Sequence, residues 1–398
     1  MYDVLVVGGG LGGASFGKAM AEHGARVMIV EREHQFRDRV RGEGMHPWGV
    51  VEAERVGVLK PLLDTCGQPA RWWNIYAGPN RVERRDLVAT TASAVGALSF
   101  YHPAMQQALL DAAARAGAAI WRPAEVVDIV PGTPPVAVVR TETRQERLQA
   151  RLVVAADGRT SRARTLAGFA ARRDPEILGI AGVLHAGLDL PEDTVQMWTN
   201  WSRGEAVLLF PQGGGRFRSY LLYSRQGPLR PLTGHRHAEH FLDACKKAGA
   251  PTKWFDSAQT IGPLASFDAA DRWVDHPYRT GVALIGDAAA ASDPCFGCGL
   301  SLTLRDVRVL RDCLIATSDW EAAARAYAAE HDRYYGALRT IIGWMRQLYY
   351  ERGPEADQRR ARTLPYLARE PERGPDLRAA GPDAPSDETA RRRFFALD

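Results

Sequence analysis

The first thirty residues carry the pattern that most restricts the fold of this chain. Residues 3–7 form a short, valine-rich apolar run, typical of a strand buried on both faces. A glycine-rich turn, a helical stretch and a second apolar run ending at Glu31 follow directly. This order predicts a strand–helix–strand unit of the dinucleotide-binding type.

The glycines of the turn have the spacing that such a unit requires. Gly8 permits the tight turn, and Gly10 lets the backbone approach a pyrophosphate. Gly13 allows the helix to pack closely on the strand, and Gly12 lies in the same turn. We therefore expect the helix to begin with free N–H groups that face a diphosphate.

The acid at the end of the second strand completes the fingerprint. Glu31 follows Gly10 by 21 residues and is placed to accept hydrogen bonds from an adenosine ribose. Arg32 comes next and is assigned to the same cofactor site. Because NAD and FAD both contain ADP, this fingerprint alone does not distinguish them.

Two later stretches repeat the design of a buried strand that ends in an acid. One strand covers residues 152–155 and stops before Asp157, and another covers 282–286 and stops before Asp287. The second is followed by a turn with Gly297 and Gly299, and then by a helical stretch that starts near Leu300. Acids at the carboxyl ends of parallel strands point into the ligand crevice, although Asp-Gly is also a routine turn.

Three separated motifs, GGGLGG with Glu31, AADGRTSRAR, and GDAAAASDPCFGCGLSLTLRDVRVL, occur in the order found in one known family. The chain resembles the single-component FAD-dependent aromatic monooxygenases of the para-hydroxybenzoate hydroxylase type over residues 1–345. The resemblance implies an α/β fold: a Rossmann-like FAD-binding domain, an inserted antiparallel β-sheet substrate domain and C-terminal helices.

The resemblance also implies roles for individual residues. Asp287 would hold the ribityl chain of FAD, and Gly297, Gly299 and Leu300 would present backbone N–H groups to the flavin. Three further positions match segments that border the cofactor in the family: Arg41, His102 and Gln106. A helix-starting histidine and a solvent-facing glutamine are equally good explanations of the last two.

The Cys-x-x-Cys pair in the third motif has three interpretations. Cys295 and Cys298 could form a redox dithiol, half of a metal site, or incidental small residues in a flavin-facing turn. A metal site needs two more ligands that no suitably spaced pair supplies, so we predict no metal. Incidental small residues are favoured, and redox activity stays open.

Two aromatic-rich segments lie between the flavin motifs. We expect residues 71–100 and 177–267 to form the substrate domain, with Gly213–Gly215 as a turn between two of its strands. The FAD-binding domain then consists of 1–70, 101–176 and 268–345, and residues 346–398 form a C-terminal helix and an extended tail. Six residues are candidates for the substrate pocket, although core packing explains most of them as well: Trp72, Trp73, Trp198, Trp201, Phe210 and Pro294.

Composition excludes several other classes of protein. The 398 residues are 45% hydrophobic and 25% charged, which is ordinary globular composition. The net charge of +4 is spread along the chain, so nucleic-acid binding is not expected. No apolar run is long enough to span a membrane, and a cytoplasmic location is the default expectation.

The expected function is an FAD-dependent monooxygenase that uses NAD(P)H and O2 to hydroxylate or epoxidise an organic, aromatic or polycyclic substrate. No second fingerprint is present, so the nicotinamide cofactor would visit transiently. The alternative is a flavin-dependent reductase of the geranylgeranyl-reductase kind. A flavin halogenase and a non-catalytic escort protein of the Rab-GDI kind are less favoured, and the oligomeric state is open.

Overall fold

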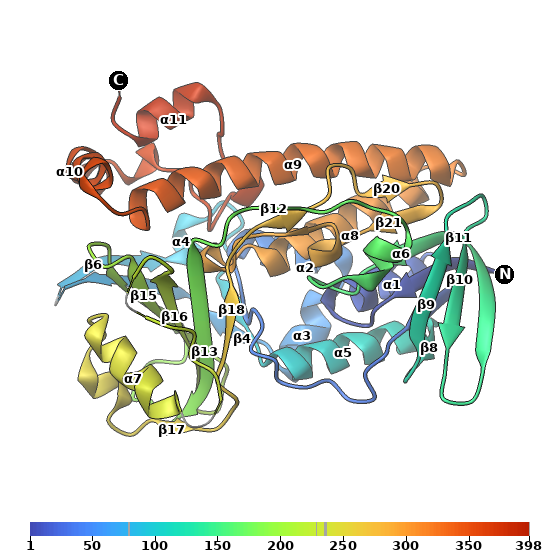
Figure 1. The fold of residues 1–398 in the computed structure, drawn as a ribbon, viewed down its shortest axis with the longest axis horizontal. Helices are drawn as coiled ribbons and strands as arrows, with labels where there is room; N and C mark the ends of the chain where they lie inside the picture. The colour runs from blue at the N-terminus through green and yellow to red at the C-terminus, as the bar shows by residue number, and fades with distance from the viewer. Residues whose placement is uncertain (79, 228, 235–236, 398) are drawn as a thin grey trace.

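The computed structural model describes residues 1–78, 80–227, 229–234 and 237–397, and it contains two large β-sheets. Figure 1 shows the sheets side by side along the long axis, with the long helix α9 (Trp320–Tyr349) running across both. The mixed α/β fold predicted from the sequence is confirmed.

The first sheet contains the predicted dinucleotide-binding unit. Its central strands pair in parallel, since none of them is joined to its neighbour by a tight hairpin. The order is β20 (Tyr278–Arg279), β21 (Val282–Leu284), β11 (Gln145–Ala155), β1 (Tyr2–Val7), β2 (Val27–Val30) and β8 (Ala119–Trp121). An antiparallel pair, β9 (Glu125–Val130) and β10 (Val136–Arg140), extends β11.

Helices pack against this sheet through apolar side chains. Strand β1 is buried from Val4 to Val7, and strands β2 and β21 of the same sheet are buried throughout. The helices of this part are α1 (Leu11–Glu22), α2 (Pro47–Val56), α3 (Leu59–Thr65), α5 (His102–Arg115), α6 (Arg162–Leu166) and α8 (Gly299–Ile315). Short strands form two separate three-stranded sheets: β3 (Gly44–Met45), β7 (Ala97–Ser99) and β4 (Gln68–Ala70) in one, and β12 (Arg172–Arg173), β19 (Arg272–Trp273) and β22 (Ala290–Ala291) in the other.

The second sheet comes from the two aromatic-rich segments. Its order is β17 (Gln259–Thr260), β13 (Leu178–Ala186), β16 (Arg216–Ser224), β15 (Glu205–Pro211), β14 (Thr194–Asn200), β5 (Trp72–Ala77) and β6 (Asn80–Asp86), with β18 (Ala265–Asp268) also on β13. The turn of three glycines joins β15 to β16 as predicted. Helices α4 (Leu87–Thr90) and α7 (Ala238–Lys247) and the 3-10 turn η2 (Thr252–Phe255) belong to this part.

The sequence predicted an antiparallel sheet here, but one pair of its strands is parallel. Strands β5 and β14 pair in parallel, from Thr194 opposite Trp72 to Thr199 opposite Ala77. The two strands are more than one hundred residues apart in the chain, so no hairpin forces them to run in opposite directions. The proposed domain boundaries stay a prediction.

The C-terminal segment is only partly the extended tail that we expected. It contains α10 (Pro354–Arg369), α11 (Glu388–Phe394) and the turns η5 (Pro371–Arg373) and η6 (Gly381–Asp383). Leu377, Phe394 and Phe395 are buried against the rest of the protein. The segment is rich in Pro, Arg and Asp, and its charges form ion pairs with the rest of the protein, such as Arg305–Asp383 at 2.7 Å.

Candidate functional site

The glycine turn after β1 leaves no room for side chains. Gly8 has φ +101°, and a Cβ there would lie 2.7 Å from the Ala156 carbonyl oxygen. A Cβ on Gly13 would lie 1.9 Å from the Gly8 carbonyl oxygen, which explains the close packing of helix on strand. Helix α1 starts after Gly10 without a side-chain cap, so its first N–H groups are free to bind a ligand.

Glu31 is buried at the end of β2, beside this turn. Its Oε2 accepts a hydrogen bond from the Gly9 backbone N–H at 2.7 Å, and its Oε1 accepts one from the Glu33 N–H at 2.7 Å. A carboxylate oxygen can accept more than one hydrogen bond, so a ribose hydroxyl can still be bound. The neighbouring Arg32 is more exposed and lies 3.5 Å from the Glu33 carboxylate.

The structure places near the same glycine turn the three further residues that the family resemblance assigned to the cofactor site, Arg41, His102 and Gln106. A Cβ on Gly10 would be 3.4 Å from Nε2 of Gln106, so this side chain faces the start of α1. His102 is the first residue of α5, and its Nδ1 lies 2.9 Å from the Gly42 carbonyl oxygen. Burial lowers the pKa of His102 to about 4. Burial also lowers the pKa of Arg41, partly offset by Asp287.

Asp287 and the start of α8 form the second half of the site. A Cβ on Gly299 would lie 3.8 Å from Oδ1 of Asp287, so the acid faces the helix start. Helix α8 also begins without a side-chain cap. Burial raises the pKa of Asp287, although the charges of Arg159 and Arg41 act in the opposite direction.

Asp157 has a different role from Asp287 despite its similar place at a strand end. Its carboxylate accepts hydrogen bonds from Ser161 Oγ, from the Arg162 N–H at 2.8 Å and from the Ala163 N–H at 3.0 Å. These contacts stabilise the first turn of α6. The routine structural interpretation of the Asp-Gly turn therefore accounts for most of the hydrogen bonding of Asp157.

One cavity of about 1780 Å³ connects nearly all of these residues. Gly13 does not line it, because this glycine packs between helix and strand. The predicted cofactor residues that do line it are Gly8, Gly10, Gly12, Glu31, Arg32, Arg41, His102, Gln106, Asp157, Asp287, Gly297, Gly299 and Leu300.

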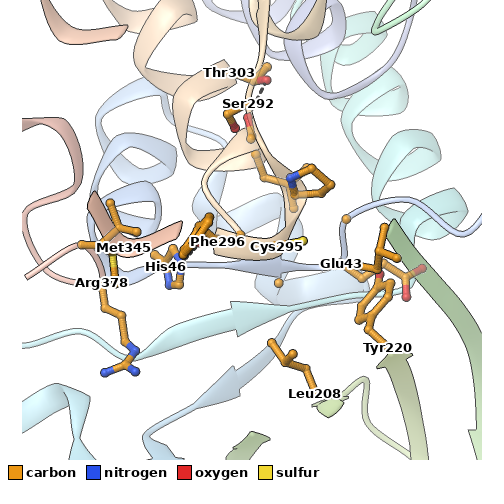
Figure 2. A pocket seen from close by; sticks show the side chains of 18 of the residues that line it. Glu43, His46, Leu208, Tyr220, Ser292, Cys295, Phe296, Thr303, Met345 and Arg378 are labelled. Atoms are coloured by element: carbon orange, nitrogen blue, oxygen red, sulfur yellow. Dashed lines mark hydrogen bonds between the residues drawn. The ribbon is translucent and has the colours of Figure 1, made fainter. Parts of the chain in front are cut away.

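The same cavity continues into an apolar chamber against the second sheet, which we define by Trp73, Leu208, Phe210, Phe296 and Met345. Figure 2 shows Leu208, Phe296 and Met345 around this pocket. Five of the six predicted substrate residues line the cavity: Trp72, Trp73, Trp201, Phe210 and Pro294.

The prediction for Trp198 is wrong. Its ring stacks on Tyr76 at 5.6 Å and meets Trp254 edge-on at 6.1 Å, in a separate core on the other face of the sheet. Side chains alternate along a strand, so its neighbours Met197 and Thr199 line the cavity instead.

His46 is a site residue that the sequence did not reveal. It precedes α2, lines the cavity, and its Nε2 lies 2.8 Å from the Phe296 carbonyl oxygen in the flavin-motif turn. Burial lowers its pKa to about 4, so the ring is neutral at neutral pH and Nε2–H donates to Phe296. A histidine before a proline has no distinctive spacing, so only the fold places it here.

A buried ion-pair cluster connects the second sheet to the loop that follows β2. Arg218 of β16 is fully buried and donates from Nε to Glu43 at 2.6 Å and from Nη2 to Asp38 at 2.8 Å. Tyr220 donates to the Arg41 carbonyl oxygen at 2.5 Å. These contacts hold the loop that carries Arg41. The glutamate lies between two glycines, Gly42 and Gly44, a context that gives no sign of this role.

Another buried cluster holds the loop of Asp287 from behind. Asp306 of α8 accepts a hydrogen bond from the Gly286 N–H at 2.7 Å and from Tyr334 at 2.5 Å, and it lies 3.0 Å from Nδ1 of His331. Helix α9 thus supports the turn whose acid faces the cavity.

The two cysteines of the third motif do not form a disulfide and are both buried. Burial raises the thiol pKa of Cys295 and of Cys298 well above the usual range, which disfavours the reactive thiolate. No cluster of potential metal ligands occurs among the described residues. Within the same residues, no helix is both long and apolar enough to cross a membrane.

The donor set of the cavity fits FAD. Two uncapped helix starts suit the diphosphate and the flavin carbonyl edge, and Glu31 and Asp287 suit the ribose and ribityl hydroxyls. Comparison with known families agrees, because residues 1–337 match the FAD binding domain family. This chain belongs to that family. It is an FAD-dependent oxidoreductase of the aromatic monooxygenase type.

Relatives of this flavoprotein include enzymes of two kinds. It is 29% identical to ubiquinone hydroxylase UbiL of Rhodospirillum rubrum over 363 residues, covering 83% of this chain and 76% of the relative. It is 26% identical to digeranylgeranylglycerophospholipid reductase of Thermoplasma volcanium over 310 residues, covering 75% and 74%.

Among solved structures, the flavoprotein is similar to p-nitrophenol 4-monooxygenase PnpA of Pseudomonas putida DLL-E4. The TM-score is 0.78 at 18% identity, and the match covers 100% of this chain and 97% of the other. At this identity the likeness supports the fold alone.

Proposed function

We propose that this flavoprotein uses NAD(P)H and O2 to hydroxylate or epoxidise an aromatic or polycyclic organic substrate. The observation that carries the proposal is the single cavity that joins the cofactor turn to the apolar chamber. Its volume of about 1780 Å³ exceeds the roughly 300–1,000 Å³ of an ordinary ligand pocket, so there is room for FAD and a second molecule.

Bound FAD would supply the redox chemistry, accepting hydride from NAD(P)H and activating O2. The protein's own residues bind and orient. Glu31 and Asp287 would bind the ribose and ribityl chain, while Arg41, Gln106 and the N–H groups at Gly297–Leu300 would contact the rest of the cofactor. The aromatic walls of the chamber exclude water from the reacting groups.

The domain assignment belongs to the same proposal. Segments 1–70, 101–176 and 268–345 would bind FAD, and segments 71–100 and 177–267 would cover the substrate. Two separate hydrophobic cores support this division, because one lies wholly within the first set of segments and the other wholly within the second.

A panel of phenols and polycyclic aromatics tests the proposal, with the FAD-loaded protein and NADH or NADPH. A substrate should stimulate NAD(P)H oxidation and O2 consumption together, with formation of a product that contains one more oxygen atom. Failure of every compound to couple NAD(P)H oxidation to oxygenated product would contradict it.

The second candidate is a flavin-dependent reductase, favoured by the relative from Thermoplasma volcanium that matches three quarters of the chain. The same panel should then include isoprenoid alkenes and an anaerobic arm. A reductase would saturate a double bond without O2, whereas the proposed monooxygenase forms no product under those conditions.

A further inference from the structure

One wall of the apolar chamber comes from a part of the chain outside the family match. The match ends at residue 337, but most of residues 371–385, which we call the C-terminal strap, also line the cavity. The strap lies against β6 through Asp376, which accepts from Arg85 at 2.6 and 2.8 Å. This wall therefore lies outside the residues that the family model matches, and none of the three sequence motifs includes it.

Arg378 of the strap has fewer of its N–H donors bonded than Arg85 of β6. Arg85 is fully engaged, because Nη1 and Nη2 bind Asp376 and Nε binds Thr90. Among the residues that the structure describes, Arg378 donates only from Nη1, to Glu83 at 2.9 Å, and its guanidinium lies 4.9 Å from the centre of the Trp73 ring. An arginine has five N–H donors, so Arg378 keeps several for a ligand.

The surroundings of Arg378 strengthen an interaction with an anion. Figure 2 shows Arg378 and His46 on the same side of the pocket, next to Met345. His46 is neutral, since burial lowers its pKa to about 4, and the Trp73 ring contacts it at 5.6 Å. A charge pair formed against such apolar walls is screened less than in water.

We propose that Arg378 is a specificity-determining residue that binds an anionic oxygen, such as a carboxylate, of the substrate in the apolar chamber. The inference rests on the proposed function, because it assumes that this chamber receives the substrate. Trp73 would hold the guanidinium in place, and Glu83 would moderate its charge in the free protein.

Isothermal titration of the FAD-loaded protein tests the inference without turnover. The probes are matched pairs of increasing ring size: benzoate and benzamide, 2-naphthoate and 2-naphthamide, anthracene-2-carboxylate and its amide. In the wild type, at least one carboxylate should bind about tenfold more tightly than its amide, as expected for a hydrogen bond to a charged group.

Three variants separate recognition from structure. Arg378→Met should abolish the preference while leaving amide and FAD affinities unchanged, and Arg378→Lys should restore part of it. Glu83→Gln should strengthen carboxylate binding, because Arg378 loses its acidic partner. Arg369→Met is the control, since this α10 arginine does not line the cavity.

The inference is overturned if carboxylates and amides bind equally, if no carboxylate binds, or if Arg378→Met keeps the preference. These outcomes are independent of oxygenation. A preference for carboxylates without any oxygenated product would contradict the proposed function but not the role of Arg378. Efficient oxygenation of amides, with none of the carboxylates, would contradict the role of Arg378 but not the proposed function.

Discussion

The two ends of the cavity are built from different parts of the polypeptide. The cofactor end uses backbone: glycines without room for a Cβ, two uncapped helix starts and acids at strand ends. The substrate end uses side chains from segments far apart in the sequence, including Trp73, Phe210, Phe296 and Arg378. A site built from backbone needs particular residues at fixed spacing, whereas a wall built from side chains needs only suitable volume and polarity. This difference explains why the cofactor end can be predicted from the sequence more readily than the substrate end.

The largest effect is expected from a methyl group at the cofactor end. Gly13→Ala places a Cβ about 2 Å from the Gly8 carbonyl oxygen, so we expect the free energy of unfolding to fall by about 3 kcal/mol or more. FAD affinity should fall with it. Chemical denaturation and an FAD titration measure the two effects.

Gly336→Ala is the matched control for this variant. It lies in α9 with nothing within 4 Å of the added Cβ, and alanine should stabilise the helix by about 0.5–1 kcal/mol. Equal stability of the two alanine variants would mean that the glycine turn is not tightly packed.

The next effect separates the two acids at strand ends. Asp287→Ala should weaken FAD binding by roughly 1.5–3 kcal/mol, through loss of a charge-assisted hydrogen bond. Asp157→Ala should instead lower the free energy of unfolding by about 1 kcal/mol, because it removes the contacts that stabilise the start of α6. FAD titrations and denaturation curves of both variants provide the comparison. The reverse pattern, with Asp157 controlling FAD affinity, would exchange their roles.

The sequence was most informative where chemistry depends on the backbone. The glycine turn and Glu31 were predicted from spacing, and Asp287 from its place at a strand end together with the family resemblance, because strand ends and helix starts determine where such residues lie. The β15–β16 turn was predicted for the same reason. At the substrate end, the aromatic residues were found by type alone, so Trp198 could not be assigned to the correct face of its strand.

Residues that act through long-range contacts were missed. Glu43 and Arg218 are 175 residues apart, and neither stands in a recognisable motif. The strap was interpreted as a tail because its composition is polar, yet Asp376 and Arg378 pair with β6, almost three hundred residues earlier. Only the three-dimensional fold brings such residues together.

The free energy of unfolding is expected to depend on pH through Asp293, a buried acid in the third motif. Burial, with the nearby Asp271, raises the pKa of Asp293 to about 7. Between about pH 4 and 7 the folded chain keeps a proton that the unfolded chain has lost. The free energy of unfolding therefore falls as pH rises through this window, by up to about 1.4 kcal/mol per pH unit.

Asp293→Asn should make this decline shallower, since the amide cannot ionise and its oxygen can still accept from the Cys295 N–H. Urea denaturation of both proteins between pH 4 and 8 measures the slope. Parallel curves for wild type and variant would show that Asp293 is ionised in the folded protein throughout.

The smallest effect is expected from replacing the two cysteines of the third motif. Cys295→Ser with Cys298→Ser should keep most of the rate of flavin reduction, because buried thiols with raised pKa values are poor nucleophiles. Stopped-flow absorbance at the flavin band measures this rate. Loss of reduction in a folded, FAD-loaded double variant would instead establish a redox dithiol.

The fate of labelled oxygen tests the central claim most directly. With a substrate identified by the panel, the reaction is run under ¹⁸O₂ in unlabelled water, and the ¹⁸O content of the product is measured by mass spectrometry. The account predicts one ¹⁸O atom in each product molecule for each NAD(P)H oxidised in its formation. A product without ¹⁸O, or one formed equally well without O2, would contradict a monooxygenase and favour the reductase.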